Sequence, residues 1–217
     1  MKPILFNTEM VRAIMDERKT VTRRVVKPQR DEDMDGNLHE FSAVDGENRF
    51  VWADRPNIKT LIKLPYQIGD ILYVRETWSK DDSGEYVYRT NYGTTEDDSF
   101  PPSMFKWHPS IHMPKEAARL FLQVTDVWAE RLQDITKRQA ADEGQPGCSG
   151  LTICGGPSGC YLCEAAIENS IKWFSEIWDS TIKPTDLPLY GWDANPWVWV
   201  IEFERCEKPK EEMKPNE

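Results

Sequence analysis

Long hydrophobic runs are absent from this sequence of 217 residues. No stretch approaches the ~18 consecutive apolar residues of a transmembrane helix, and residues 1–9 lack the apolar core of a signal peptide. The sequence also contains no internal repeat. We therefore expect a cytoplasmic protein that is not attached to a membrane.

Positive charge is scarce as well. The chain has 27 lysines and arginines against 37 aspartates and glutamates, for a formal net charge of −10 at pH 7. Non-specific binding to long nucleic acid needs many phosphate contacts from a basic surface, so this composition argues against it. A small basic pocket for a single nucleotide or a single-stranded segment remains compatible with the charge.

Histidine is rare, with 3 residues in the chain. His108 and His112 lie four positions apart in a proline-rich stretch, but the sequence offers no further ligands to complete a metal site around them. We therefore do not expect a metal centre built on histidine.

Cysteine is unevenly distributed, because four of the 5 cysteines crowd into one insertion. They are Cys148, Cys154, Cys160 and Cys163. Their closing C-x2-C pair and glycine-rich loops suit a tetrahedral zinc site made of thiolates, and a reducing cytosol disfavours a disulfide framework. Structural zinc and free thiols both remain open. A zinc ion here would hold the insertion together, and no cofactor is required for catalysis.

Against this acidic background, residues 17–24 concentrate positive charge. The segment reads Glu-Arg-Lys-Thr-Val-Thr-Arg-Arg, which combines one lysine, three arginines and two threonine hydroxyls. Either these cations form a solvated face, or they line a pocket for an anionic or polar ligand on which the lysine acts.

Hydrophobic periodicity predicts an α+β fold around this segment. A helix begins at about residue 8, with Asn7 or Thr8 as its N-cap, and another covers residues 164–180. Strands are expected at residues 3–6, 21–26, 71–76, 85–92, 120–132 and 197–206, with a small hairpin near 50–53. Strands around one or two helices, without a βαβ rhythm, indicate a small β-barrel or a strongly bent sheet.

A third helix is predicted from local capping signals. Thr136 and Gln139 form a capping-box pattern at its start, and the helix runs to Glu143 before Gly144 ends it. We expect one domain over residues 1–206, with insertions at about 29–60 and 145–163. Residues 207–217 form a charged tail that we expect to be disordered.

Several motifs follow one another in a recognisable order. The first motif, Arg-Lys-Thr-Val-Thr-Arg-Arg, follows a helix, and the second is Ile-Gly-Asp-Ile-Leu-Tyr-Val. The third is Leu-Gln-Asp-Ile-Thr, which leads into a short helix ending Asp-Glu-Gly. The last is Trp-Val-Trp-Val-Ile-Glu-Phe. This order resembles the ASCH domain, a PUA-like β-barrel superfamily associated with RNA binding and with RNA or nucleoside metabolism. Met-Pro-Lys-Glu-Ala-Ala-Arg-Leu and Asn-Pro-Trp-Val-Trp-Val are similar to ASCH-like proteins of phages and prophages. The resemblance covers residues 4–28, 64–78, 115–144 and 197–205, and it implies a small barrel with flanking helices and loop insertions.

The superfamily signature is Gly-x-Lys-x-x-Glu-x-Arg. Lys19 and Arg24 match it, whereas Glu17 replaces the glycine and Thr22 replaces the glutamate. Threonine at this position is shared with a branch of amidohydrolases that deacetylate N4-acetylcytidine. In that branch the threonine is the nucleophile, the lysine accepts its proton, and a glutamate on the later short helix donates a proton. Glu143 matches that glutamate, so the resemblance implies catalytic roles for Lys19, Thr22 and Glu143.

The chemistry of these three residues is consistent with such a reaction. A threonine hydroxyl is a poor nucleophile unless an adjacent base removes its proton. Lys19 can be that base only if its pKa is lowered, and burial together with neighbouring arginines acts in this direction. Glu143 in a partly apolar setting can protonate the leaving amine. Backbone amides or Arg24 can stabilise the oxyanion.

Six further residues are candidates for ligand binding. They are Arg18, Arg23, Arg24, Glu76, Trp78 and Trp107. Arg23 and Arg24 also fit a surface or salt-bridge pair, and Glu76 also fits a cross-strand salt bridge. Trp78 and Trp107 can stack on a base.

We expect recognition of RNA or of a modified nucleoside, with a nucleoside or a single-stranded RNA segment as the partner. In the enzymatic version, the protein hydrolyses the amide of an N4-acylated cytidine. The alternative is a phage-encoded module that captures nucleic acid or a host protein and catalyses nothing. The sequence does not determine the oligomeric state.

Overall fold

The computed structural model describes residues 1–27, 41–44, 49–55, 58–92, 104–147 and 167–209. The four clustered cysteines and residues 210–217 lie outside these ranges, so the zinc site and the disordered tail stay predictions. The chain divides into two compact units. The first comprises Met1–Asp16, Asp70–Gln123 and Glu204–Glu217, and the second comprises Glu17–Gly69 and Val124–Phe203.

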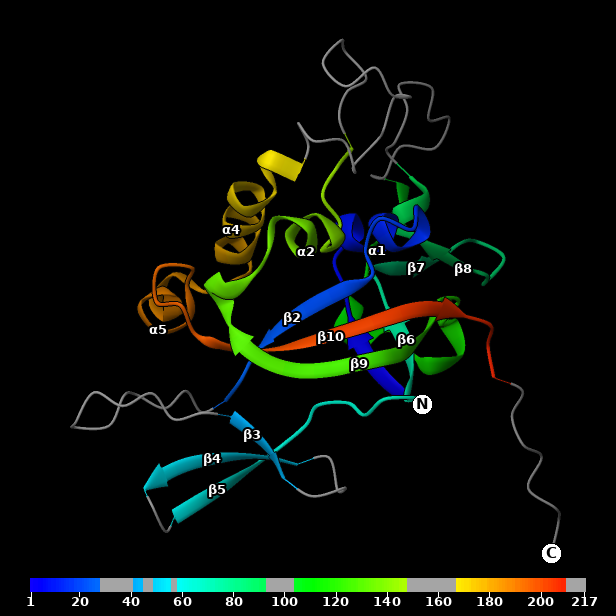
Figure 1. Ribbon diagram of the computed structural model, residues 1–217. Coiled ribbons are helices and arrows are strands. Elements are labelled where there is room, and N and C mark those ends of the chain that lie inside the picture. Colours follow the sequence, from blue (N-terminus) through cyan, green and yellow to red (C-terminus); the bar gives the residue numbers. More distant parts are fainter. Residues whose placement is uncertain (28–40, 45–48, 56–57, 93–103, 148–166, 210–217) are drawn as a thin grey trace, which may run out of the picture. The chain divides into compact units, whose positions relative to one another are not determined.

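A five-stranded sheet has the strand order β1-β6-β9-β10-β2 (Figure 1). Its strands are β1 (Lys2–Leu5), β6 (Ile71–Arg75), β9 (Phe121–Arg131), β10 (Trp197–Cys206) and β2 (Val21–Val25). β1 pairs with β6 in parallel, whereas the β6–β9 and β10–β2 pairs are antiparallel. The sheet and its accompanying helices confirm the predicted α+β class. The described strands do not form a closed barrel.

In the first unit, helix α1 (Thr8–Met15) begins as the sequence predicts. The Asn7 side chain accepts a hydrogen bond from the Met10 amide at 2.8 Å, which satisfies one of the donors left open at the helix start. Val11 and Ile14 are buried, as expected for the apolar face of an amphipathic helix.

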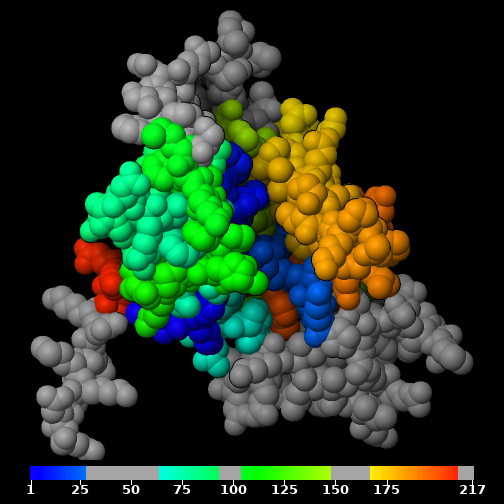
Figure 2. All heavy atoms as spheres, turned by 180° about the vertical axis from the view of Figure 1, so that it is seen from behind, coloured from blue at the N-terminus to red at the C-terminus, as the bar shows by residue number. Residues whose placement is uncertain are grey.

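The rest of the first unit is built from short elements. They are β7 (Trp78–Lys80), β8 (Tyr86–Tyr88) and the 3-10 turns η1 (Arg89–Asn91), η3 (Ser110–His112) and η4 (Lys115–Ala117). In Figure 2 the blue-green segment with β7 and β8 lies against the green segment that follows residue 103. The strand expected at residues 85–92 is shorter than predicted. Arg12 donates to the carbonyl oxygens of Thr90 and Tyr92, which holds the chain in a turn there.

The second unit contains a three-stranded antiparallel sheet in the order β3-β4-β5. Its strands are β3 (Phe41–Val44), β4 (Arg49–Arg55) and β5 (Ile58–Lys63). This sheet is larger than the small hairpin that the sequence predicts. The unit's helical elements are η5 (Leu132–Asp134), α2 (Lys137–Asp142), α4 (Ser170–Thr181), η6 (Pro184–Asp186) and α5 (Leu187–Tyr190).

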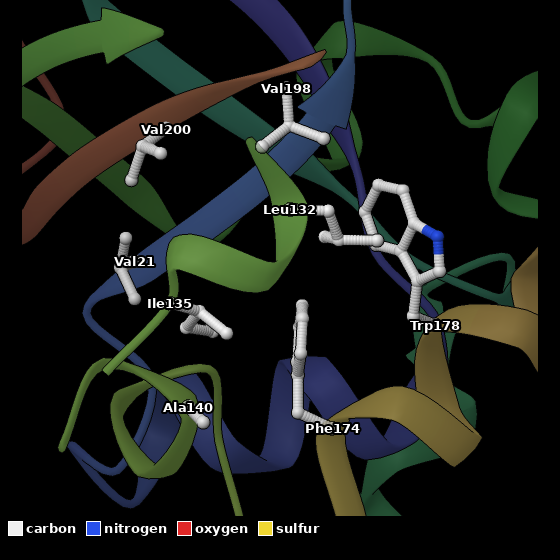
Figure 3. Close-up of a cluster of buried hydrophobic side chains, with 8 residues drawn as sticks. All are labelled: Val21, Leu132, Ile135, Ala140, Phe174, Trp178, Val198 and Val200. Carbon is white, nitrogen blue, oxygen red and sulfur yellow. The ribbon is translucent and has the colours of Figure 1, made fainter. Parts of the chain in front are cut away.

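An apolar cluster joins α4 to the sheet in the second unit (Figure 3). Its buried residues are Val21, Leu132, Ile135, Ala140, Phe174, Trp178, Val198 and Val200. Phe174 and Trp178 project from α4 at the spacing of one helical face, towards Val198 of β10. Burying a side chain such as phenylalanine contributes roughly 1.5–3 kcal/mol. This cluster therefore supports β2, the strand that carries Thr22 and Arg23.

No helix in the described ranges has both the length and the apolar character needed to cross a bilayer.

Candidate functional site

Lys19 and Glu143 meet through the backbone as well as through their side chains. They form an isolated antiparallel β-bridge although they are 124 positions apart in the chain. Next to this bridge, the amide of Thr20 donates to the carbonyl oxygen of Asp142 at 3.0 Å. The position of the two side chains is therefore set by paired backbone rather than by flexible loops.

Glu17, two positions before Lys19, has a left-handed backbone conformation. Helix α1 ends with Asp16 as its C-cap, and Glu17 has a φ of 60°. A residue with a Cβ atom is strained in this region by roughly 1–2 kcal/mol, and glycine is not. Glu17, which replaces the glycine of the signature, therefore keeps a glycine-like turn in spite of this strain.

The chain reaches Glu143 through helix α2. The Gln139 amide donates to the Thr136 hydroxyl at 3.2 Å, and the Gln139 side-chain oxygen accepts from the Thr136 amide at 3.0 Å. This confirms the predicted capping box. Glu143 is the C-cap of the helix, and Gly144 follows with a φ of 107°, so the predicted glycine stop is also confirmed.

Within the described residues, the Lys19 ammonium makes three hydrogen bonds. Its Nζ lies 2.6 Å from Oε2 of Glu143, 2.8 Å from the carbonyl oxygen of Glu143, and 2.8 Å from the carbonyl oxygen of Val21. Lys19 is 3% exposed and Glu143 is 5% exposed. A buried ion pair with all three N–H donors satisfied is the arrangement that offsets the cost of desolvating both charges.

Arg23 extends this pair into a network, so the salt-bridge alternative for Arg23 is present, although the sequence did not predict its partners. Its guanidinium donates to Oε1 of Glu143 at 3.2 Å, and its Nε and Nη2 donate to Oε1 of Glu130 at 3.1 and 2.7 Å. Trp128 Nε1 donates to the other oxygen of Glu130 at 2.8 Å. Two buried cations and two carboxylates thus compensate one another.

A sequence signal for this network does exist. Arg23 alternates with Val21 and Val25 along β2, so the strand period assigns a charged residue to the apolar face. A guanidinium on such a face requires a carboxylate partner. The sequence does not say which of the chain's many acidic residues provides it.

Burial lowers the pKa of Lys19. The Glu143 carboxylate opposes this shift by charge and by hydrogen bonding, and the cations Arg24 and Arg23 add to it. The direction is the one that a lysine base requires, because a lower pKa makes proton loss easier. In the geometry described, however, Lys19 acts as a donor to three oxygen atoms.

Thr22 lies next to this network, on β2. It is buried, and it is paired with Ile201 of β10. Strand alternation gives its side chain the face opposite to that of Arg23. Within the described residues, the Thr22 hydroxyl makes no hydrogen bond to Lys19 Nζ. The two groups are nevertheless linked, because Lys19 binds the Val21 carbonyl of the peptide unit that leads into Thr22.

The two remaining arginines of the basic segment differ in their surroundings. Arg18 Nη1 donates to the carbonyl oxygens of Gly144 and Gln145 at 2.9 and 3.0 Å, so it holds the chain that leaves α2. Arg24 lies opposite Trp199 of β10, and part of its side chain is exposed. Burial of the guanidinium nevertheless lowers its pKa, and the nearby Tyr66 and Glu143 oppose this shift. By strand alternation Arg24 shares the face of Thr22.

Glu76 belongs to the first unit, where it is 1% exposed. Its Oε1 accepts from Arg119 Nε at 2.9 Å, and its Oε2 accepts from the Thr90 hydroxyl at 2.7 Å and from Arg119 Nη2 at 3.1 Å. The salt bridge that the sequence offered as one alternative is therefore present. Arg119 follows η4 rather than lying in a neighbouring strand.

Trp78 and Trp107 also belong to the first unit, whereas Lys19, Thr22 and Glu143 belong to the second. The Trp78 ring lies 4.9 Å from that of His108. Trp107 packs with Tyr92 and Phe105, at 5.7 and 5.3 Å between ring centroids. The candidate binding residues thus fall into two sets, one in each unit.

A metal site is not found in the described parts of the chain, where no group of three or more histidine, cysteine, aspartate or glutamate residues could hold an ion. The cysteines of the predicted zinc site, Cys148, Cys154, Cys160 and Cys163, lie outside those parts.

In comparisons with known proteins, no family model matches the chain, and neither a curated protein nor a solved structure matches it significantly. The function is therefore inferred from the residues of this chain.

Proposed function

We propose that this protein recognises a modified nucleoside or a single-stranded RNA segment through Lys19, Thr22, Arg24 and Glu143. In this proposal it is an ASCH-type protein of the PUA-like class, as the order of its motifs indicates. The net charge of −10 favours a small ligand over a long duplex, because acidic residues outnumber the cations that would contact phosphates.

The proposed reaction is hydrolysis of an N4-acylated cytidine. Neutral Lys19 takes the hydroxyl proton of Thr22 while Oγ1 forms a bond to the acyl carbon. The bond between that carbon and N4 then breaks, and protonated Glu143 gives its proton to the departing amine. Water cleaves the resulting threonine ester, returning one proton to Glu143, while Lys19 returns its proton to Thr22. The products are cytidine and a carboxylic acid.

One observation carries this proposal, namely the buried 2.6 Å contact between Lys19 Nζ and Glu143 Oε2. The reaction starts from neutral lysine and protonated glutamate, which contain the same number of protons as the ion pair. A single proton shift along this contact therefore converts one form into the other. Burial favours the uncharged form, because a charge is costly to desolvate.

A second candidate function is binding without catalysis, to a nucleic-acid element or to a host protein. It is favoured by Arg23, whose guanidinium donates to Glu143 Oε1 and so stabilises the carboxylate. It is also favoured by the carbonyl oxygens of Val21 and Glu143, because they accept hydrogen bonds from Lys19 and so stabilise its ammonium form. Burial favours the uncharged pair that catalysis needs, whereas these hydrogen bonds favour the ion pair. The two candidate functions differ in which of these effects is larger.

Incubation with N4-acetylcytidine tests the reaction, because deacetylation changes the ultraviolet absorption of the base. We expect turnover by the wild type and a loss of about 10³-fold or more in Lys19→Ala and in Thr22→Ala. Thr22→Ser keeps a hydroxyl and should keep measurable activity. Thr20→Ala is the matched control, because Thr20 is the exposed threonine two positions away, and it should behave as wild type.

Absence of turnover by the folded wild type would exclude the hydrolase on this substrate. The binding candidate is then tested by titrating wild type and Arg24→Gln with N4-acetylcytidine and with a single-stranded oligoribonucleotide. Saturable binding that weakens in Arg24→Gln supports recognition without chemistry, whereas no binding of either ligand contradicts it.

A further inference from the structure

A groove in the first unit is lined by aromatic and charged side chains that the proposed reaction does not use. Its volume is about 520 Å³, and one wall is β7 with the turn that follows it, while the other is the segment around Phe105. The lining residues are Trp78, Ser79, Lys80, Asp81, Asp82, Ser83, Met104, Phe105, Lys106 and His108. Pockets of roughly 300–1,000 Å³ accommodate ligands of the size of a nucleotide.

The two walls are held together by backbone and side-chain hydrogen bonds. Trp78 and His108 form an isolated β-bridge, with the Trp78 amide donating at 3.2 Å and the His108 amide donating at 2.7 Å. The buried hydroxyl of Ser79 donates to the carbonyl oxygen of Lys106 at 3.0 Å. The groove is thus a built feature of the unit, with both walls fixed before a ligand arrives.

Aromatic rings provide the apolar surface of the groove. The rings of Trp78 and His108 are 4.9 Å apart and inclined by 30°, which is close to stacking. Phe105 is half-buried and contacts Tyr92 and Trp107 at 5.0 and 5.3 Å between ring centroids. Rings supported in this way present flat surfaces, and a base that stacks on such a ring gains about 1–3 kcal/mol.

The indole N–H of Trp78 gives the groove a specific polar feature. It is buried, and it has no hydrogen-bond partner within the described part of the chain. Buried donors are almost always paired in native proteins, so an unpaired one requires an explanation. An acceptor atom of a bound ligand would provide one.

Two lysines and two aspartates line the groove, so its formal charges balance. Asp81 is committed to its own turn, because its Oδ1 accepts from the amide and hydroxyl of Ser83 at 2.9 and 2.6 Å and from the amide of Glu85 at 3.0 Å. Both lysines, Lys106 and Lys80, are exposed, and the Lys80 ammonium is held 4.8 Å from the Tyr86 ring centroid. Two lysines at a groove with aromatic walls match the phosphate and base of a nucleotide.

We propose that this groove binds one nucleotide, either free or at the end of a single strand. The base stacks on Phe105, a carbonyl oxygen of the base accepts the Trp78 indole hydrogen, and the phosphate lies at Lys106 and Lys80. The proposal rests on the proposed function only in assuming a ligand of the nucleic-acid class. It does not require Lys19, Thr22 or Glu143, nor any hydrolysis.

Isothermal titration of the full chain with cytidine monophosphate, cytidine and ribose 5-phosphate tests the proposal. We expect saturable binding of the monophosphate with a Kd of about 1 mM or tighter, and binding at least about fivefold weaker for each of the other two. If the monophosphate does not saturate, or ribose 5-phosphate binds equally well, the groove is not a nucleotide site.

Variants then assign the binding to the groove. Lys106→Gln should weaken the monophosphate about three- to tenfold without changing binding of cytidine, whereas Phe105→Leu and Trp78→Phe should weaken both. Lys115→Gln is the control for charge, because Lys115 is exposed in the same unit and outside the groove lining. Equal weakening in Lys115→Gln, or no change in any groove variant, would overturn the proposal.

The outcome can be separated from that of the hydrolase experiment. Thr22→Ala should bind the monophosphate as the wild type does, even if it loses activity towards N4-acetylcytidine. If Thr22→Ala also abolishes binding of the monophosphate, the nucleotide occupies the Lys19 site and the groove proposal is wrong.

Discussion

Glu143 Oε2 lies 2.6 Å from Lys19 Nζ, and both side chains are almost excluded from solvent. The carboxylate is therefore placed between two cations, because Arg23 occupies its other oxygen. In water such a contact contributes little to stability, whereas in a buried site the removal of one member leaves a charge without its partner.

Lys19→Met should destabilise the protein by about 3–5 kcal/mol, because it leaves the Glu143 carboxylate buried with Arg23 as its remaining cation. The double variant Lys19→Met/Glu143→Leu should lose less than the sum of the two single variants, since it removes both members and Arg23 retains Glu130. Urea unfolding of the four proteins measures this coupling. Additive losses would contradict a direct interaction between the two side chains.

Arg23→Lys should cost about 1–3 kcal/mol in the free energy of unfolding. A lysine keeps the charge but cannot reproduce a planar fork that serves Glu130 and Glu143 together. Arg24→Lys, at the neighbouring position of the same strand, should cost less than Arg23→Lys, because the Arg24 side chain is partly exposed. Equal effects at the two positions in urea unfolding would show that the network does not contribute.

Local sequence signals predicted the elements around the site well. The Asn7 cap, the Thr136–Gln139 capping box and the strand Trp197–Cys206 all depend on residues close together in the chain, and all three are confirmed. The left-handed turn at Glu17 was also detectable, because the position suits glycine.

Long-range partners were not predictable in the same way. Arg23 pairs with Glu130, which is 107 positions away in the sequence, and Glu76 pairs with Arg119, which is 43 positions away. A single sequence shows that each buried charge needs a partner, but it does not show which partner the fold brings near. The choice between a small barrel and a strongly bent sheet depended on strand pairing at the same range, and a closed barrel is not found among the described strands.

Glu17→Gly should stabilise the protein by roughly 0.5–1 kcal/mol. Glycine adopts a φ of 60° without strain, although it gains more entropy on unfolding, so the net effect is smaller than the strain itself. Asp16→Gly is the matched control, because Asp16 has a φ of −83° and no such strain to relieve. Thermal unfolding measures both variants, and a stabilisation in Asp16→Gly as large as that in Glu17→Gly would contradict this explanation.

Glu202→Gln should stabilise the protein at pH 7 and have little effect near pH 4. Partial burial raises the pKa of the Glu202 carboxyl, the carboxylates of Asp126 and Asp142 raise it further, and Arg23 opposes them. The folded state therefore binds the Glu202 proton more tightly than the unfolded state does, for which the reference pKa is 4.5. The stability from this group is fully present below pH 4.5 and is lost as the pH rises through the higher pKa of the folded state.

At neutral pH the wild type thus carries a carboxylate in an unfavourable site, which glutamine removes. We expect a rise in Tm of about 1–3 °C at pH 7 that disappears on acidification. Glu204→Gln, two positions along β10 and exposed, should leave Tm nearly unchanged at both pH values. A rise in Tm for Glu202→Gln that is the same at pH 4 and pH 7 would mean that the effect comes from packing, and that repulsion among Glu202, Asp126 and Asp142 has no part in it.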